Sequence, residues 1–265
     1  MKIAITGKGG VGKTTLAAGL ASEFSREGKK VFAIDADPDA NLALTLGFPN
    51  PSRIKPLIKL KKLIEERTHA KIGSLNPYFK LNPRVDDIPE KYFAHHQGIN
   101  LMVMGTVRGG GLGCTCPENA FLRALLSHLM LEREEVVIMD MEAGIEHLGR
   151  GTARGVDQLM VVVEPGTRSI QTAFRIEDLA KDIGIENIVA VGNKIRTDSD
   201  QKFLITNMPD FQFLGFIPYE EKIVEADLAN VSSFDLNKDI LPEIKRIAGK
   251  IKKELDSSGK VPRYS

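Results

Sequence analysis

A glycine-rich loop near the N-terminus constrains the fold of this chain more than any other feature. The loop GKGGVGKTT, residues 7–15, follows the apolar run KIAIT and opens an amphipathic segment from Thr14 to Glu27. Between a strand and a helix, such glycines let successive backbone N–H groups turn inward, and the helix N-terminus adds the positive end of its dipole. This pattern is typical of a P-loop, which holds the phosphates of a nucleotide.

The positions within the loop have separate expected roles. Lys13 is expected to reach the β- and γ-phosphates, the Thr14 hydroxyl to ligate Mg²⁺, and Thr15 to touch the α-phosphate. The backbone amides expected to cradle the phosphates belong to Gly9, Gly10, Val11 and Gly12.

Short apolar runs alternate with amphipathic segments along the chain. The runs are KIAIT, KVFAID, INLMVM, EVVIMD, QLMVVVE, NIVAVGN and FQFLGFIP, and the later helical segments are Pro117 to Leu131, Ser169 to Ile183 and Lys238 to Leu255. Continuous apolar runs suit parallel strands buried on both faces. Their alternation with helices predicts an α/β fold, a doubly wound and mostly parallel sheet of the P-loop NTPase class.

The length of 265 residues, with 42% hydrophobic residues, allows one large domain with a full core, so we expect a single P-loop ATPase domain over residues 1–265. A stretch rich in proline, lysine and asparagine at about 49–98 is interpreted as an insertion between the second and third strands. We expect a solvated surface excursion there, and a partner-docking element is the alternative.

Charge and hydropathy exclude some classes of partner. Thirty-six Lys and Arg against 35 Asp and Glu leave a net charge of +1, too weak a field to grip a nucleic acid backbone. No apolar run approaches the ~20 residues that span a bilayer, and the N-terminus does not resemble a secretory signal. We expect a cytoplasmic protein without nucleic acid or membrane partners.

Lys8 adds a second lysine early in the loop, where an ordinary P-loop needs no charge. The form GKGGVGKT resembles the deviant P-loop ATPases that include Min and Par proteins and the nitrogenase iron protein. The resemblance implies that Lys8 crosses to the nucleotide of a partner copy and neutralises charge during phosphoryl transfer, as an arginine finger does. It therefore implies an ATP-driven homodimer.

Acidic residues follow the second and fourth expected strands, where ligands gather in open α/β sheets. In DADPDANL, the resemblance implies that Asp39 orients the attacking water and that Asp37 lies near the magnesium shell. In VVIMDMEAG, Asp140 is placed for a water-mediated Mg²⁺ contact, and Gly144 could offer its amide to the γ-phosphate.

The nucleotide base is predicted to be adenine. GTPases of this fold class place a carboxylate two residues after an Asn-Lys pair, whereas VGNKIRTD has Arg196 there, and a cation cannot accept hydrogen bonds from guanine. Asn193 is a candidate adenine contact. The family closes over the base after the last strand, where Pro218, Tyr219 and Glu220 lie.

The only two cysteines, Cys114 and Cys116, share one bend, GLGCTCPEN. In a reducing compartment, closely spaced cysteines more often bind metal or do redox work than form a structural disulfide. A pair fills half of a metal site, so two copies across a dimer axis could supply four thiolates to Ni²⁺ or Zn²⁺. Incidental thiols and a redox pair are the alternatives.

Three features together closely resemble the nickel-insertion accessory ATPases of carbon monoxide dehydrogenase, the CooC family. They are the deviant P-loop, the GLGCTCPEN loop before a helix, and the extended DMEAGIEHLGRGT stretch. The stretch contains Glu142, His147 and Arg150, to which no roles are assigned. The resemblance implies delivery of nickel to carbon monoxide dehydrogenase or acetyl-CoA synthase, with ATP hydrolysis opening and closing the homodimer.

Two other functions remain open. Nitrogenase iron proteins hold an iron–sulfur cluster with well-separated cysteines, one of them after the Mg²⁺ aspartate, and this chain has none there; a cluster held by the Cys-x-Cys pairs of two chains is nevertheless conceivable. Of the positioning ATPases, one of the Min type needs a basic amphipathic C-terminal helix that binds anionic lipid. The last helical segment has that pattern, but packing on its own sheet explains it better.

Overall fold

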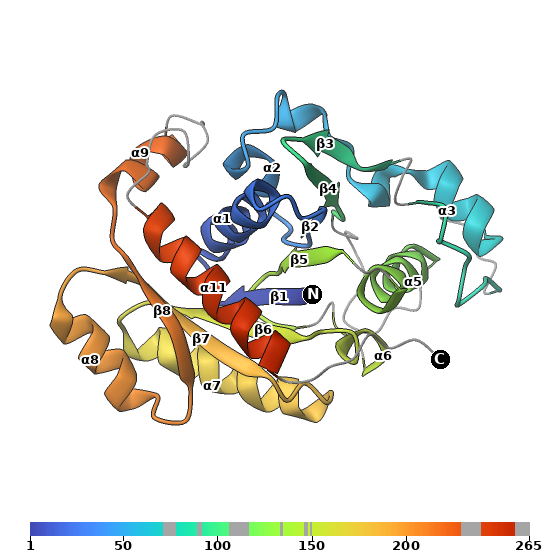
Figure 1. The fold of residues 1–265 in the computed structure, drawn as a ribbon. Helices are drawn as coiled ribbons and strands as arrows, with labels where there is room; N and C mark the ends of the chain where they lie inside the picture. The colour runs from blue at the N-terminus through green and yellow to red at the C-terminus, as the bar shows by residue number, and fades with distance from the viewer. Residues whose placement is uncertain are drawn as a thin grey trace.

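The computed structural model describes residues 1–70, 78–88, 92–105, 117–132, 135–145, 148, 150–228 and 240–257. In these residues an eight-stranded sheet has the order β3-β4-β2-β5-β1-β6-β7-β8 (Figure 1). Its strands are β1 (Lys2–Gly7), β2 (Val31–Asp35), β3 (Ala94–His96), β4 (Ile99–Val103), β5 (Val136–Asp140), β6 (Gln158–Val163), β7 (Ile188–Ile195) and β8 (Gln212–Pro218). All neighbouring pairs are parallel except β3 with β4, at one edge. The predicted doubly wound α/β fold is confirmed.

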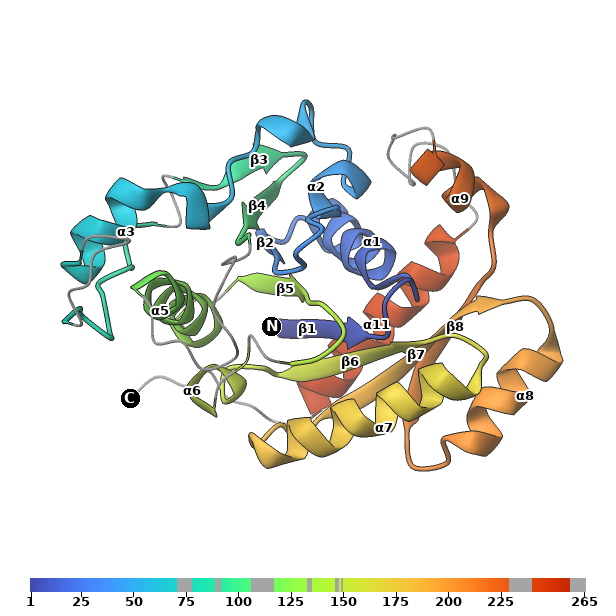
Figure 2. The same cartoon turned by 180° about the vertical axis from the view of Figure 1, so that it is seen from behind.

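Helices cover both faces of the sheet (Figures 1 and 2). The α-helices are α1 (Lys13–Arg26), α2 (Leu42–Thr45), α3 (Lys61–Thr68), α5 (Pro117–Glu132), α6 (Arg150–Ala153), α7 (Thr167–Asp182), α8 (Asp198–Asn207), α9 (Glu221–Leu228) and α11 (Leu241–Ser257), and the 3-10 turns are η1 (Pro51–Arg53) and η2 (Leu57–Lys59). One core lies between the sheet and α1 and α11, and the other lies under α3, α5 and α7.

The strand residues alternate between these two cores. Ile3 and Ile5 of β1 belong to the core with α1, whereas Ala4 belongs to the core with α5. Because successive side chains of a strand point to opposite faces, a central strand must be apolar throughout. This requirement explains why the continuous apolar runs predicted seven of the strands.

The short edge strand β3 and the helix α8 were not predicted. The three residues of β3, Ala-His-His, are intermediate or exposed, so no apolar run marks them. Helix α8 buries only Leu204 among its ten residues, and its start is instead fixed by a capping box between Thr197 and Asp200. Elements with little apolar burial leave a weak hydrophobic pattern.

Residues 49–98 contribute more to the core than a solvated excursion would. Leu57, Ile64 and Ile88 are at most 1% exposed and join the core under α5. Phe93 packs edge-on against Phe32 of β2, with ring centroids 4.8 Å apart. These buried residues of the stretch therefore pack against the sheet and α5, whereas Tyr78 and Leu81 stay exposed.

Helix α11 packs on the sheet, as predicted. Ile244, Ile247 and Ile251 are at most 1% exposed and lie against α1 and β8. Its apolar face is therefore already covered, and its lysines lie on the remaining surface. Among the helices that the structure describes, none combines the length and the apolar character needed to cross a membrane.

Candidate functional site

The glycine loop follows the carboxyl end of β1, in the middle of the sheet, and leads into α1. Gly12 sits directly before α1 with φ of 96°, in the left-handed region. A Cβ on Gly12 would lie 2.1 Å from Nδ2 of Asn193, so both backbone conformation and space require glycine here. The predicted strand–loop–helix context of a P-loop is therefore confirmed.

Three side chains hold the backbone of the loop. Nδ2 of Asn193 donates to the Val11 carbonyl at 2.7 Å, and Nζ of Lys194 donates to the Gly10 carbonyl at 2.7 Å. Nζ of Lys13 donates to the Lys8 carbonyl at 3.4 Å, across the loop itself. These bonds occupy carbonyl groups and not N–H groups, although the Val11 amide itself donates to the Lys8 carbonyl at 3.4 Å. Asn193, predicted as a base contact, thus also supports the loop.

A cavity of about 430 Å³ opens over the loop. Of the residues predicted to bind nucleotide or magnesium, those lining it are Gly10, Gly12, Lys13, Thr14, Thr15, Asp37, Asp39, Asn193, Pro218, Tyr219 and Glu220. Residues far apart in the sequence thus surround one space of the size that small-molecule sites have. The lining also includes Asn41, Thr45, Lys194 and Ile223, which sequence reasoning missed.

Five predicted residues do not line this cavity: Lys8, Gly9, Val11, Asp140 and Gly144. Lys8 forms an ion pair with Glu164, at 3.1 Å between Nζ and Oε1. The amide of Gly144 donates to the Thr6 hydroxyl at 3.3 Å, and that hydroxyl donates to the Gly144 carbonyl at 2.8 Å. A contact from the Gly144 amide to a γ-phosphate requires this amide to leave Thr6, so that contact stays a prediction.

Asp140, at the end of β5, is a buried carboxylate next to the loop. The side chain is fully buried, and neither of its oxygens has a hydrogen bond of good geometry among the described residues, although the Thr14 hydroxyl is close enough to interact with it. Burial raises the pKa of Asp140 to about 7, although Thr14 and Lys13 oppose this shift. A buried, unsatisfied carboxylate near a threonine hydroxyl fits the coordination shell of Mg²⁺, which prefers oxygen ligands.

Asp35, at the end of β2, is a second buried carboxyl, directly beside Asp140 in the register of the sheet. Burial, and then the charge of Asp140, raise the pKa of Asp35 to about 8. Asp35 accepts hydrogen bonds from the amides of Leu42 at 3.0 Å and Asp37 at 3.3 Å. Asp37 in turn accepts from the Asp39 amide at 3.0 Å. The buried carboxyl thereby shapes the loop that carries Asp37 and Asp39.

Tyr219, which lines the cavity, stacks on the cation of Arg196. The guanidinium carbon of Arg196 lies 3.8 Å from the centroid of the Tyr219 ring. Arg196 and Tyr219 line an adjoining cavity of about 360 Å³, with Glu164, Lys194 and Asp200. The position at which a guanine-binding site needs a carboxylate is thus held by a stacked cation.

Cys114, Cys116 and His147 lie outside the described residues, as does the side chain of Arg150. Glu142 is exposed, and its carbonyl accepts from the Thr6 hydroxyl at 3.1 Å. No group of three or more His, Cys, Asp or Glu placed to hold a metal ion occurs in the part of the chain that the structure describes. The predicted thiolate site therefore stays a prediction.

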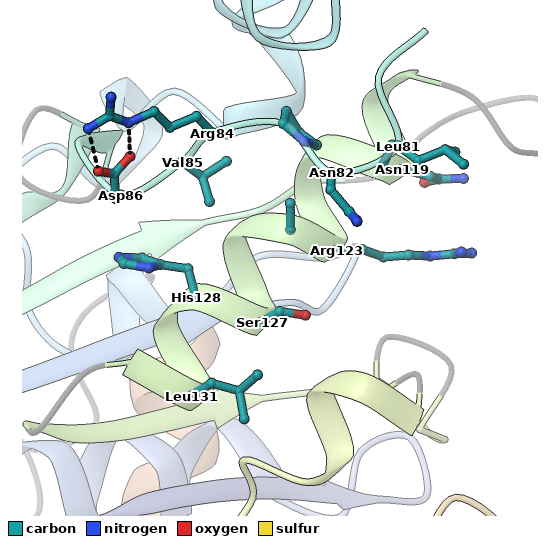
Figure 3. Close-up of a pocket in the computed structure, with 13 residues that line it drawn as sticks. Leu81, Asn82, Arg84, Val85, Asp86, Asn119, Arg123, Ser127, His128 and Leu131 are labelled. Carbon is teal, nitrogen blue, oxygen red and sulfur yellow. Dashed lines mark hydrogen bonds and ion pairs between the residues drawn. The ribbon is translucent and has the colours of Figure 1, made fainter. Parts of the chain in front are cut away.

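A larger cavity, of about 780 Å³, lies between residues 81–86 and α5 (Figure 3). At one end Arg84 and Asp86 point toward each other, with Nε and Nη2 of the arginine 2.7 and 2.8 Å from the two carboxylate oxygens. On α5, the Ser127 hydroxyl is hydrogen-bonded to Thr152. The charged pair at this end is thus already satisfied.

A P-loop after the central strand and a buried aspartate at the end of the adjacent strand define a P-loop nucleotide hydrolase. The comparisons with known proteins agree. Residues 2–233 match the CobQ/CobB/MinD/ParA nucleotide binding domain family. The chain belongs to this family of ATPases and, within it, to the CooC proteins, because it is 51% identical to a CooC relative over most of both chains.

That relative is the carbon monoxide dehydrogenase accessory protein CooC of Rhodospirillum rubrum, matched over 89% of this chain and 90% of its own length. An uncharacterized ATP-binding protein of Methanocaldococcus jannaschii is 45% identical over 93% of this chain and 96% of its own. The cell division protein MinD of Aquifex aeolicus has a similar fold, with a TM-score of 0.67 at 21% identity over 98% of both chains. The MinD likeness shows the fold alone.

Proposed function

We propose that this chain is an ATP-dependent metallochaperone that binds nickel and delivers it to carbon monoxide dehydrogenase or acetyl-CoA synthase. The observation that carries the proposal is the 51% identity to CooC, whose name describes an accessory protein of carbon monoxide dehydrogenase. The Cys-x-Cys pair at Cys114 and Cys116 supports it, because two thiolates per chain complete a four-thiolate nickel or zinc site only when two copies meet.

The position of the cysteine segment in the topology supports a link between metal and nucleotide. The segment lies between the end of β4 and the start of α5, which begins one residue after Cys116. Strand β4 is parallel to β2, and Val103 pairs in register with Asp35. The chain therefore leaves the sheet toward the cysteines at the same edge as the loop carrying Asp37 and Asp39.

The residues at this edge can divide the work of ATP hydrolysis. Lys13 and the loop amides would hold the phosphates, and Asp39 would orient the attacking water. Mg²⁺, held by Thr14 and through water by Asp140, with Asp37 near its shell, would neutralise charge on the phosphates. Lys8 would act on the nucleotide of a partner copy, so hydrolysis would require a homodimer, and loss of the γ-phosphate would reopen it.

The two alternatives have less support. A positioning ATPase that binds lipid needs a free amphipathic helix, but the apolar residues of α11 lie in the core. A reductase needs a bound iron–sulfur cluster, and its preparation under exclusion of oxygen would be brown. The metallochaperone is therefore the function to test first.

Anaerobic equilibrium dialysis against Ni²⁺, with and without a non-hydrolysable ATP analogue, tests the proposal. We expect the wild-type chain to bind about one nickel per two chains, and more tightly with the analogue. The Cys114→Ser/Cys116→Ser variant should lose this binding but retain affinity for ATP, which serves as the control for folding. Nickel binding that is absent, or that persists in the double variant, contradicts the metallochaperone function.

A further inference from the structure

Glu164 joins two lysines, Lys8 of the P-loop and Lys194, which lines the nucleotide cavity. It follows the last residue of β6, and its two carboxylate oxygens face different partners. Oε1 lies 3.1 Å from Nζ of Lys8, and Oε2 lies 3.2 Å from Nζ of Lys194. The Glu164 amide donates to the Ser169 hydroxyl at 3.1 Å, which fixes its backbone against the start of α7. The carboxylate is therefore held in place between the two ammonium groups.

The environment keeps Glu164 ionised. Its side chain is 23% exposed. Partial burial raises the pKa of Glu164, but hydrogen bonds from Lys8 and Lys194 outweigh burial and leave the pKa below its usual range. The side chains of Lys8 and Lys194 are 39% and 40% exposed, so both pairs are partly exposed and are weakened by water and salt.

Through Lys194, Glu164 is also connected to the backbone of the P-loop. Lys194 donates to the Gly10 carbonyl at 2.7 Å while it pairs with Glu164. The backbone of Lys194 has φ of 57°, in a left-handed conformation that costs free energy for a residue with a Cβ. Its two side-chain contacts help to hold it there. One carboxylate thus connects the lysine that begins the loop with the lysine that supports it.

The Glu164 carboxylate and the phosphate oxygens of a nucleotide would compete for the same partner, the ammonium group of Lys8. We propose that Glu164 is a positioning residue that holds Lys8 on its own chain until the phosphates of a nucleotide in a partner copy replace the carboxylate. The proposal rests on the proposed function, because it takes the transfer of Lys8 to a partner copy as the step that closes the dimer. The Glu164–Lys8 pair then opposes closure, since closure must break it.

The test measures dimer formation by sedimentation against the concentration of a non-hydrolysable ATP analogue. The variants are Glu164→Gln, Lys8→Met and their combination, which form a double-mutant cycle. Gln keeps the size of the side chain and removes its charge. The matched control is Glu177→Gln on α7, which breaks another glutamate–lysine pair, with Lys181 at 2.6 Å, away from the cavity.

We expect Glu164→Gln to lower the analogue concentration for half-maximal dimer by about two- to tenfold, the range for losing one partly exposed ion pair. The same substitution should cause no shift in the Lys8→Met background, and Glu177→Gln should cause none in wild type. A shift that persists in Lys8→Met, or the absence of any shift in Glu164→Gln, overturns the positioning role.

Two further results separate this inference from the proposed function. If the wild-type chain does not dimerise with the analogue, the proposed ATP-driven dimer fails, and the role of Glu164 fails with it. If wild type dimerises but Glu164→Gln shifts nothing, only the role of Glu164 is overturned. The competing explanation is that Glu164 acts by supporting the P-loop through Lys194. It is correct if the shift caused by Glu164→Gln disappears in a Lys194→Met background but persists in the Lys8→Met background.

Discussion

Among single residues, Asp140 and Asp35 make the stability of the nucleotide-free chain depend on pH. Their pKa values of about 7 and about 8 lie above the ordinary value of 3.8. Between about pH 4 and about pH 8 the folded chain therefore binds more protons than the unfolded chain. The free energy of unfolding falls as pH rises through this range. Stability falls because the two carboxylates become charged while they are buried next to each other, which costs free energy.

Replacing Asp140 by Asn should remove part of this dependence. We expect Asp140→Asn to be more stable than wild type above about pH 7, by on the order of 2–4 kcal/mol, and the difference to shrink as pH falls from about 7 toward about 4. Urea unfolding with EDTA and without nucleotide measures it. The same variant should lose Mg²⁺-dependent ATP hydrolysis. An equal pH slope in both proteins would contradict the burial of this charge.

Arg196 should contribute to the choice of base. It stacks on Tyr219 where guanine recognition needs a carboxylate. We expect wild type to bind ATP more tightly than GTP, and Arg196→Asp to reduce this ratio at least about threefold, because a carboxylate can accept guanine's N–H groups. Competition binding measures the ratio. The control, Arg175→Asp on the exposed side of α7, makes the same change in charge and should leave the ratio unchanged.

For the elements, the packing of α11 on β8 depends on a glycine in the strand. A Cβ on Gly215 would lie 2.7 Å from Cγ1 of Ile247 and 2.5 Å from Oε1 of Glu243, both on α11. We expect Gly215→Ala to destabilise the fold by about 1–3 kcal/mol, because the helix must move away from the sheet. Thermal and urea unfolding measure this loss.

Gly249, within α11 itself, provides the matched control. A Cβ there would meet no atom within 4 Å. Gly249→Ala should therefore stabilise the protein by about 0.5–1 kcal/mol, the gain in helix propensity. If both alanine variants change stability in the same direction, the close contact between β8 and α11 is not what requires glycine at position 215.

For the whole molecule, the proposed function requires that nickel and ATP affect each other's binding equally. If the ATP analogue tightens nickel binding by some factor, nickel must tighten binding of the analogue by the same factor, because the coupling free energy is reciprocal. We expect each ligand to increase the affinity for the other by about 5- to 150-fold. Titrations of each ligand at saturating and zero levels of the other measure the two factors.

The cysteine variant distinguishes coupling through the thiolates from other effects. In Cys114→Ser/Cys116→Ser, nickel should no longer change the affinity for the ATP analogue, while the affinity without nickel stays at the wild-type value. Coupling that remains in this variant would mean that nickel acts elsewhere, for example by replacing Mg²⁺ near Thr14 and Asp140.

The sequence by itself determined seven of the described strands, the four longest described helices, the P-loop, and the family. These features depend on local patterns: an apolar run for a strand buried on both faces, and glycines where the loop between β1 and α1 must turn. Lys13 and Thr14 could be assigned because their roles follow from their place in a short motif.

Only the tertiary structure brought Glu164 and Lys194 to the P-loop and left Asp140 buried without a hydrogen bond of good geometry among the described residues. Glu164 is 156 residues from Lys8, and a single carboxylate after a strand has no distinctive local pattern. The order β5-β1-β6-β7 decides which strand ends adjoin the loop, and that order results from packing of the whole sheet. The pKa values of Asp35 and Asp140 likewise depend on burial, which long-range contacts create and no short stretch of sequence encodes.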